Sequence, residues 1–184
     1  MNFQVLKKIL QEESRKFCWG LILFARDELR REVIAKKPKL LLDIGCHNRL
    51  LEATVKEWLK TIKHRVETVG IDVVKYEVKP EVMCDGGLLP FRNNVFDFIT
   101  IVETLEHIPD YVNCLRECYR VLKKNGILFI QSVLCTSPNA YEGDESHFHV
   151  LHVNTLSRLL EWLKMKIKKR GIIKNTFYLF AIKP

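Results

Sequence analysis

The chain has 184 residues, of which 47% are hydrophobic and 28% are charged, and its formal net charge is +8. This length suits one domain with a complete hydrophobic core, and the apolar fraction excludes a chain that is disordered throughout. The longest apolar run near the N-terminus, residues 18–25, is too short to cross a bilayer and lacks the flanks of a cleaved signal peptide, so we expect no transmembrane segment.

Positive charge is concentrated towards the two ends of the chain. Residues 1–39 and 158–184 are rich in Lys and Arg, whereas residues 40–157 are net acidic. The basic ends permit contact with a nucleic acid or an anionic surface, but solvated lysines on helix faces are the simpler interpretation and the one we favour. The six cysteines form no C-x-x-C pair, which is typical of reduced thiols in an intracellular protein, so we expect a cytoplasmic location.

The first third of the chain predicts helices that lead into a strand, a turn and another helix. Apolar residues recur at helical spacing over residues 3–35, and Pro38 ends this segment. Residues 40–44 are apolar enough for a buried parallel strand. Residues 49–63 predict an amphipathic helix with Asn48 as its N-cap.

The middle of the chain alternates predicted strands and helices. Residues 66–71 predict a second strand and residues 81–84 a short third one, and the gap between them is too short for a full crossover helix. Residues 96–102 predict a fourth strand. A helix is expected over residues 109–126, followed by a fifth strand over residues 127–133.

The last part of the chain combines a long loop with a helix and a strand. Residues 134–153 show no hydrophobic period and predict a loop, which at this length is often functional. A helix is expected from Asn154 to Gly171, with basic residues crowded at its end, and residues 177–182 predict a final strand. This alternation predicts an α/β fold, a three-layer sandwich with a mostly parallel, Rossmann-like central sheet and a helical N-terminal extension.

The first functional signal is the segment at residues 43–46, which reads DIGC. A strand, a tight glycine turn and a helix are how an α/β domain holds a nucleotide-like ligand at the carboxyl end of its first strand. A dinucleotide-type turn would carry two more glycines, and His47 and Arg49 stand where we expect them. The sequence therefore indicates a nucleotide-type site with an altered turn.

Four segments of the chain carry recognisable motifs. They are residues 41–46 (LLDIGC), 69–72 (VGID), 85–97 (DGGLLPFRNNVFD) and 103–126, which begin ETLEHIPD. Together these segments resemble the class I S-adenosylmethionine-dependent methyltransferases of the type 11 family. Each motif is weak alone, but four of them in this order are specific, and the match is loose outside them. The resemblance implies the class I methyltransferase fold, S-adenosylmethionine as the cofactor, and transfer of a methyl group to an acceptor that the sequence does not identify.

Two other functions stay open. One is a catalytically silent methyltransferase-like domain that acts as a binding or regulatory partner. It is favoured by His47 and Arg49, because both positions are usually glycine in the family. The other is a nucleotide-dependent oxidoreductase, which the missing G-x-G-x-x-G motif and the segment 85–97 disfavour.

The resemblance also implies a set of cofactor-binding residues at the strand ends. Asp72 offers two acceptor oxygens to two ribose hydroxyls, Asp85 is expected to meet the adenine amino group, and Glu103 is expected beside the sulfonium. Arg49 is expected either to pair with the cofactor carboxylate or to crowd it. The predicted set is Asp43, Gly45, Cys46, Arg49, Asp72, Val73, Asp85, Gly86 and Glu103.

Two histidines are the candidate catalytic residues. His107 could take a proton from a substrate O–H or N–H, although support of the next helix is the simpler role. His147 lies in the long loop with His149 and His152, and we expect this loop to close over the acceptor. The spacing H-x-H-x-x-H matches no metal signature, so we predict no metal site.

We expect a single methyltransferase-like domain over residues 1–184. Its predicted parts are N-terminal helices over residues 1–38, a cofactor-binding core over residues 39–133, and an acceptor loop, last helix and terminal strand over residues 134–184.

Overall fold

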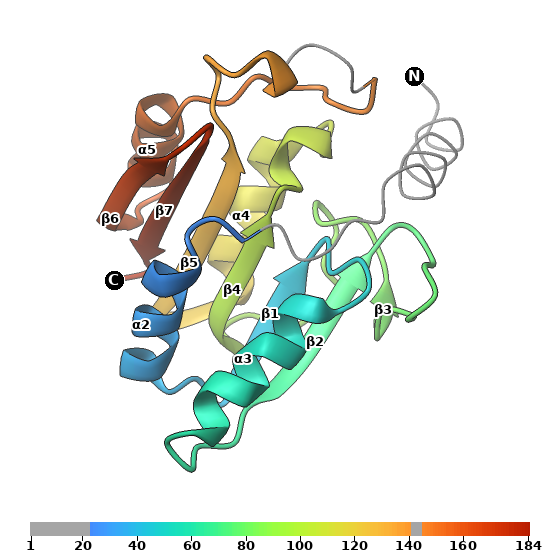
Figure 1. Ribbon diagram of the computed structural model, residues 1–184, viewed down its shortest axis with the longest axis vertical. Coiled ribbons are helices and arrows are strands. Elements are labelled where there is room, and N and C mark those ends of the chain that lie inside the picture. Colours follow the sequence, from blue (N-terminus) through green and yellow to red (C-terminus); the bar gives the residue numbers. More distant parts are fainter. Residues whose placement is uncertain (1–22, 141–144) are drawn as a thin grey trace.

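The computed structural model describes residues 23–140 and 145–184, and a seven-stranded sheet runs through its centre (Figure 1). The strands are β1 (Leu40–Ile44), β2 (Glu67–Asp72), β3 (Val82–Met83), β4 (Phe96–Val102), β5 (Leu122–Val133), β6 (Lys166–Ile173) and β7 (Thr176–Ile182). They lie in the order β3-β2-β1-β4-β5-β7-β6. The strands from β3 to β5 are parallel, and β7 runs antiparallel to both of its neighbours. The expected mostly parallel sheet is confirmed.

Helices cover both faces of this sheet. The helices are α2 (Arg26–Lys36), α3 (Leu50–Lys60), α4 (Tyr111–Val121) and α5 (Val153–Trp162), with 3-10 turns η1 (Leu105–His107) and η2 (Pro138–Ala140). α2 and α3 lie on one face, and α4 and α5 lie on the other (Figure 1). Successive strand residues point to opposite faces, so Phe98 packs beneath α2 and α3 while Ile99 packs beneath α4 and α5. The molecule is a three-layer sandwich, as expected.

The C-terminal part differs from the sequence prediction. α5 ends at Trp162, and residues expected to continue the helix to Gly171 form β6, which pairs with β7. β7 is buried almost throughout, so its outer edge needs a hydrogen-bonding partner, which β6 supplies. Gly171 does not stop a helix. A Cβ there would lie 2.7 Å from the ring of Tyr178, so the glycine permits close packing between the two strands.

Two helix boundaries also differ from the prediction. Asn48 is not the N-cap of α3: that position is held by Arg49, and the Asn48 side chain instead accepts a hydrogen bond from the Val78 amide at 3.3 Å. α4 ends at Val121, and β5 begins at Leu122 without a glycine-terminated turn between them. The chain can change direction here because Leu122 has extended dihedral angles.

The N-terminal helix and the short gap between β2 and β3 agree with the sequence prediction where the structure describes them. The N-terminal helical prediction is confirmed where α2 lies, and residues 1–22 fall outside the described part of the chain. No helix occupies the gap between β2 and β3, as expected from its length. Within the described residues, no helix combines the length and the apolar character that a membrane span requires.

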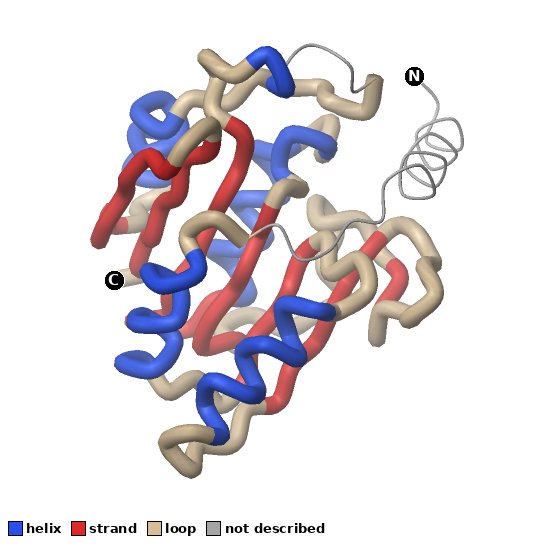
Figure 2. The backbone as a smooth tube through the Cα atoms, in the orientation of Figure 1, coloured by secondary structure: helices blue, strands red, loops and turns tan. Residues whose placement is uncertain are grey.

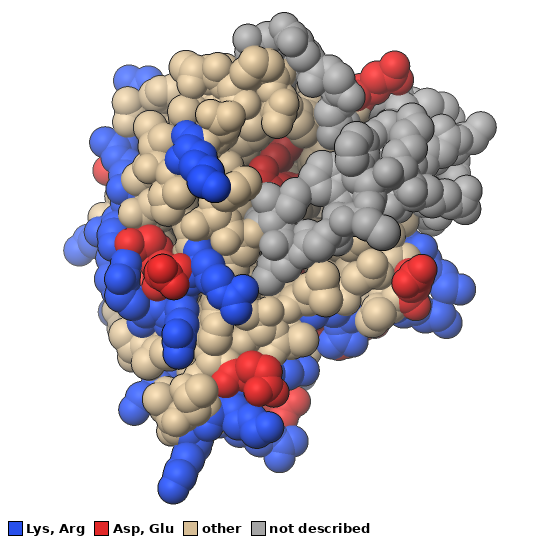
Figure 3. All heavy atoms as spheres, in the orientation of Figure 1, with Lys and Arg blue, Asp and Glu red and all other residues tan. Residues whose placement is uncertain are grey.

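Basic side chains gather along the side of the molecule that carries α2 and β6 (Figure 3). Lys168 and Lys169 of β6 form ion pairs with Glu32 and Glu28 of α2. The basic residues expected at a helix end therefore lie on a strand and tie it to a helix. Their acidic partners neutralise part of the patch, which agrees with a structural role for these lysines.

The loops that follow β1, β2, β4 and β5 emerge at one end of the sheet (Figure 2). Parallel strands have their carboxyl ends on the same side, so this edge is where an α/β sheet binds ligands. It assembles the turn after β1, residues 72–74 after β2, η1 after β4, and the long loop after β5.

Candidate active site

The glycine turn after β1 has one position that only glycine can fill. Gly45 has φ +75°, and a Cβ there would lie 2.2 Å from the Thr104 Oγ1 atom. The amides of Gly45 and Cys46 both donate to the carbonyl of Ile71, at 2.9 and 3.1 Å. The turn is therefore hydrogen-bonded to the end of β2. Gly45 has no Cβ atom, and this leaves room for the Thr104 side chain.

His47 and Arg49 occupy the positions where glycine was expected, and both have positive φ, 45° and 61°. A residue with a side chain pays for such a conformation with strain of order 1–3 kcal/mol, which the surrounding contacts must offset. The turn thus keeps a glycine-like backbone while it carries two side chains. The substitution alters the chemistry of the turn more than its shape.

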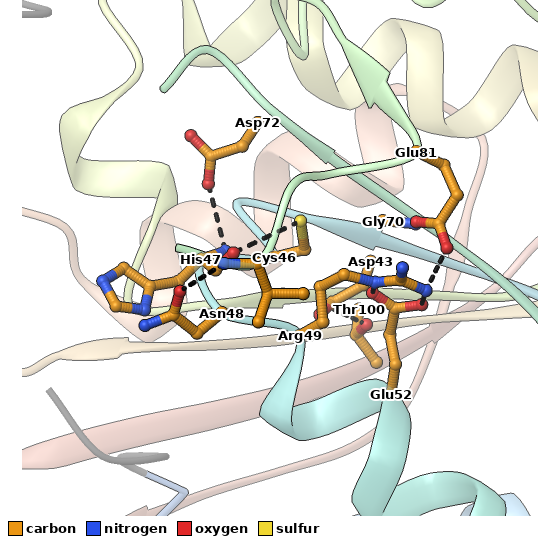
Figure 4. A network of polar contacts seen from close by, with 11 residues as sticks. Asp43, Cys46, His47, Asn48, Arg49, Glu52, Gly70, Asp72, Glu81 and Thr100 are labelled. Carbon is orange, nitrogen blue, oxygen red and sulfur yellow. Dashed lines mark hydrogen bonds and ion pairs between the residues drawn. The ribbon is translucent and has the colours of Figure 1, made fainter. Parts of the chain in front are cut away.

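The Arg49 side chain is 25% exposed, and its guanidinium lies between two carboxylates (Figure 4). Its Nε and Nη2 donate to the two carboxylate oxygens of Glu52 at 2.9 and 3.0 Å, and it also pairs with Glu81. The other oxygen of Glu81 accepts from the Gly70 amide at 2.7 Å. Arg49 therefore links α3 to β2 and to the segment before β3. The guanidinium thus has two carboxylate partners within the protein, and its two expected roles beside the cofactor carboxylate stay predictions.

Asp43 lies beneath the turn and is 3% exposed. The Thr100 hydroxyl donates to one of its oxygens at 2.6 Å. Burial, with Glu52 and Asp72 adding negative charge, raises the pKa of Asp43 to about 8, although the Thr100 hydrogen bond opposes this rise. The carboxyl is thus largely protonated at neutral pH and acts as a neutral hydrogen-bonding group under the turn.

Asp72 ends β2 and faces the turn (Figure 4). Its Oδ2 accepts from the His47 amide at 3.1 Å, and its Oδ1 accepts from the Val74 amide at 2.9 Å. Burial raises the pKa of Asp72 to about 6 against the effect of these backbone donors. The His47 ring packs on Tyr76, with 4.1 Å between the centroids, which places an aromatic pair beside the carboxylate.

Asp85 follows β3 and lies next to the end of β2. The Cys84 amide donates to the Asp72 carbonyl at 3.2 Å, and one Asp85 oxygen accepts from the Gly87 amide at 2.7 Å. A Cβ on Gly86 would lie 3.1 Å from the Cys114 sulfur, so this glycine permits close packing on α4. Asp85 and Asp72, both predicted to bind the cofactor, are thereby brought to adjacent strand ends, with half-buried Val73 next to Asp72.

Glu103 and Glu106 form an acidic pair after β4, in which Glu106 is buried and Glu103 is half-buried. The Gln131 side chain donates to Glu103 at 2.8 Å, and its oxygen accepts from the Ala25 amide at 3.0 Å. Burial, followed by the charge of Glu106, raises the pKa of Glu103 to about 8. Burial likewise raises the pKa of Glu106 to about 7. Two carboxyls that resist ionisation together mark a functional-site candidate.

The long loop docks on η1 and brings His147 to His107. The Phe148 amide donates to the Glu106 carbonyl at 2.9 Å, and the Ser146 hydroxyl lies 2.8 Å from His107 Nδ1. The rings of His107 and His147 have centroids 4.6 Å apart. The two histidines predicted to be catalytic are thus neighbours, although they lie far apart in the sequence.

The other two loop histidines have different partners. His149 Nε2 lies 2.9 Å from the Pro109 carbonyl, and its ring packs against Tyr111. His152 caps α5, because its Nδ1 accepts from the Asn154 amide at 3.1 Å. The three histidines of the H-x-H-x-x-H pattern therefore do not act as one set.

Sequence reasoning missed several polar residues that support the site. These are Glu52, Tyr76, Glu81, Thr100 and Gln131. Glu52 had a usable signal, because a carboxylate three residues after Arg49 lies on the same helix face. The other four act through tertiary contacts that no local pattern indicates.

The match to a protein family covers the strands that carry this site. Residues 42–130 match the model of a family described as a methyltransferase domain. This part of the chain is similar to that methyltransferase family. The matched region runs from β1 into β5 and contains the glycine turn, Asp72, Asp85 and η1.

Similar proteins agree with this assignment. The chain is 28% identical over 124 residues to a ubiquinone biosynthesis O-methyltransferase of Pseudomonas entomophila, over 60% of this chain and 50% of that protein. It is 27% identical over 164 residues to a demethylmenaquinone methyltransferase of Staphylococcus carnosus, over 80% of this chain and 62% of that protein. The alignment thus spans about half the length of the first relative and less than two thirds of the second.

A solved structure confirms the fold. A SAM dependent methyltransferase from Archaeoglobus fulgidus superposes on 99% of this chain and 100% of its own, with a TM-score of 0.69 and 18% identity. The expected class I methyltransferase fold, with its mostly parallel sheet, is therefore correct.

Proposed function

We propose that this chain is an S-adenosylmethionine-dependent methyltransferase that acts on a hydroxyl group of its acceptor. The observation that carries the proposal is the position of Asp72, a buried carboxylate at the end of β2 beside the Gly45 turn. It lies within the region that matches the methyltransferase family. The printed activity of the first relative, an O-methyltransferase, supports a hydroxyl as the acceptor group.

The residues around Asp72 suit this cofactor. Each Asp72 oxygen accepts one backbone amide and keeps a lone pair for a ribose hydroxyl. Beside it, the Nε2 atom of His47 is buried and has no hydrogen-bond partner within the described residues. A buried polar atom without a partner indicates a ligand, so we add His47 to the proposed binding set.

The remaining predicted residues have distinct roles in the proposal. S-adenosylmethionine supplies an electrophilic methyl group when it is bound. Asp85 would accept from the adenine amino group, and the Glu103 carboxyl would face the cationic end. His107 and His147 would hold the acceptor and receive its proton. Catalysis of this kind rests mainly on positioning the two partners and excluding water.

Three members of the predicted set support the turn in this proposal. Asp43 bonds to Thr100, Arg49 bonds to Glu52, and Cys46 is buried against the end of β2. Gly45 and Gly86 stay in the proposed binding set because they permit close packing against Thr104 and Cys114, which shapes the two turns. Val73 follows Asp72 and would line the pocket.

We also propose one domain over the whole described chain, with the cofactor core at residues 39–133. Both apolar clusters join residues of this core to β7, which supports a single unit. A cytoplasmic location is supported by the five cysteines in the described part of the chain, all of which are free thiols.

A calorimetric titration with S-adenosylmethionine and S-adenosylhomocysteine tests the proposal. We expect both to bind the wild-type chain. If neither binds at millimolar concentration, the enzyme proposal fails and the silent-domain alternative takes its place. The matched variant Asp72→Asn should bind both S-adenosylmethionine and S-adenosylhomocysteine more weakly. This result would show that the measured heat of binding comes from the site at Asp72.

A further inference from the structure

Three side chains that can ligate a metal meet at the carboxyl end of β4. One ligand atom from each of Glu106, His107 and His147 lies within 4.8 Å of the other two. Glu106 and His107 belong to η1, whereas His147 comes from the loop after β5. The fold creates this cluster, and the spacing of the histidines in the sequence does not reveal it.

Glu106 is the member that most needs a partner. Its side chain is 1% exposed, and among the residues that the structure describes neither of its carboxylate oxygens has a hydrogen-bond partner of good geometry. The Ser132 hydroxyl, the Glu103 carboxyl and the Val133 amide lie close enough to affect it, but none of these groups is a cation. A buried carboxylate without a full set of partners is costly, and a bound cation would remove that cost.

Neighbouring groups orient the cluster. The Ser146 hydroxyl lies 2.8 Å from His107 Nδ1, a contact of the kind that fixes a metal-binding imidazole through its other nitrogen. The Phe148 amide donates to the Glu106 carbonyl at 2.9 Å, which holds the loop against η1. The position of His147 is thus set by contacts on both sides of it.

We infer that Glu106, His107 and His147 bind a divalent transition-metal ion. Two imidazoles and one carboxylate suit Zn²⁺, Mn²⁺ or Co²⁺ better than Mg²⁺ or Ca²⁺, which prefer oxygen ligands. Three protein ligands leave a coordination position open, as in catalytic sites and unlike structural ones. This inference replaces the expectation, drawn from the histidine spacing, that the chain has no metal site.

The metal's role rests on the proposed function, whereas its binding does not. The cluster lies beside Glu103, at the edge of the sheet where the acceptor is expected. In the metal-bound protein His107 and His147 are ligands, so they no longer act as the base that receives the proton. The open position would take the acceptor's hydroxyl oxygen and lower the pKa of that hydroxyl, whose proton then passes to solvent. The acceptor class is then a molecule that presents a hydroxyl oxygen able to ligate a metal.

The experiment titrates the chelator-treated full chain with CoCl₂, followed by visible absorption, and with ZnCl₂, followed by calorimetry. We expect one ion per chain and the Co²⁺ absorption of a site with nitrogen and oxygen ligands. His147→Ala removes a ligand and should weaken Co²⁺ binding by about tenfold or more. Glu106→Gln keeps the shape of the side chain, removes its charge, and should weaken binding as well.

The matched control is His149→Ala, in the same loop, because His149 contacts Pro109 and Tyr111 and lies outside the cluster. Its Co²⁺ affinity should equal that of the wild type. The inference is overturned if the wild type binds no Co²⁺, if His147→Ala binds as tightly as the wild type, or if His149→Ala weakens binding equally. Circular dichroism establishes that each variant is folded.

A separate titration of the metal-free chain with S-adenosylhomocysteine distinguishes the two proposals. Cofactor binding without metal binding overturns the metal site and leaves the methyltransferase proposal standing. Metal binding without cofactor binding overturns the methyltransferase proposal and supports the metal site.

Discussion

Arg49 bonds through two nitrogens to both carboxylate oxygens of Glu52, one helical turn further along α3. Glu52 is 1% exposed, so its charge needs this partner. Arg49 stands where glycine was expected, and it supplies the positive charge that the buried carboxylate of Glu52 requires. A glycine could not supply that charge. The altered turn is a different way to hold the same backbone, because the ion pair stabilises a positive φ at Arg49.

Arg49→Gly should destabilise the protein although it relieves the strained φ. Removing one partner of a buried pair costs about 3–5 kcal/mol, and the relief at φ offsets roughly 1 kcal/mol or more of this. We expect a net loss of about 2–4 kcal/mol in the free energy of unfolding, measured by urea titration. The double variant Arg49→Gly/Glu52→Gln should recover part of the loss. A single variant as stable as the wild type would contradict this account.

Asp72→Asn should weaken S-adenosylmethionine binding. The change removes a charged acceptor at the end of β2, and the loss of a charge-assisted hydrogen bond costs about 1–3 kcal/mol. Calorimetry gives the affinities. Asp27→Asn, an exposed change on α2, is the control and should bind like the wild type. Equal affinities for all three proteins would remove Asp72 from the site.

The stability of the chain should fall as the pH rises from about 4 towards 8. The folded-state pKa of Asp43 is raised from 3.8 to about 8. The folded protein therefore keeps a proton that the unfolded chain releases, and the stability present below the unfolded pKa is lost as pH rises through this window. Asp72, with its pKa raised to about 6, acts in the same direction.

Asp43→Asn isolates the contribution of Asp43 to this dependence. The amide remains neutral at every pH, so the variant should lose less stability than the wild type between pH 5 and 8, by an amount on the order of a few kcal/mol. Urea titrations at several pH values give the two slopes. If the free energy of unfolding falls equally with pH in both proteins, Asp43 ionises normally in the folded state.

Gly45→Ala should be much more harmful than Gly87→Ala. At Gly45 the new Cβ would lie 2.2 Å from Thr104 Oγ1 and φ is +75°, whereas at Gly87 the nearest atom is 3.4 Å away. Strain and overpacking together should cost Gly45→Ala about 2–4 kcal/mol of stability. Thermal unfolding of the two variants side by side provides the comparison. Similar melting temperatures would show that the turn can move away from Thr104.

Local patterns were sufficient for most of the fold. The apolar strand at residues 40–44, the glycine at position 45 and the acid at position 72 could each be identified from a short stretch of sequence, and β4 at residues 96–102 was predicted with its observed bounds. The pattern failed at β6, because the run KIKKRGII at residues 166–173 has no strict alternation and suits a helix end or an edge strand equally. The exposed edge of β7 decided between them.

The sequence by itself determined which residue types stand at the strand ends, because backbone geometry and polarity there follow from short-range chemistry. It could not determine how side chains far apart along the chain meet. The ion pair of Arg49 with Glu81, and the meeting of His147 with Glu106 and His107, depend on where the loops dock. Only the tertiary structure decided those contacts, because the parallel sheet brings distant strand ends to one edge and burial then makes each unpartnered polar group costly.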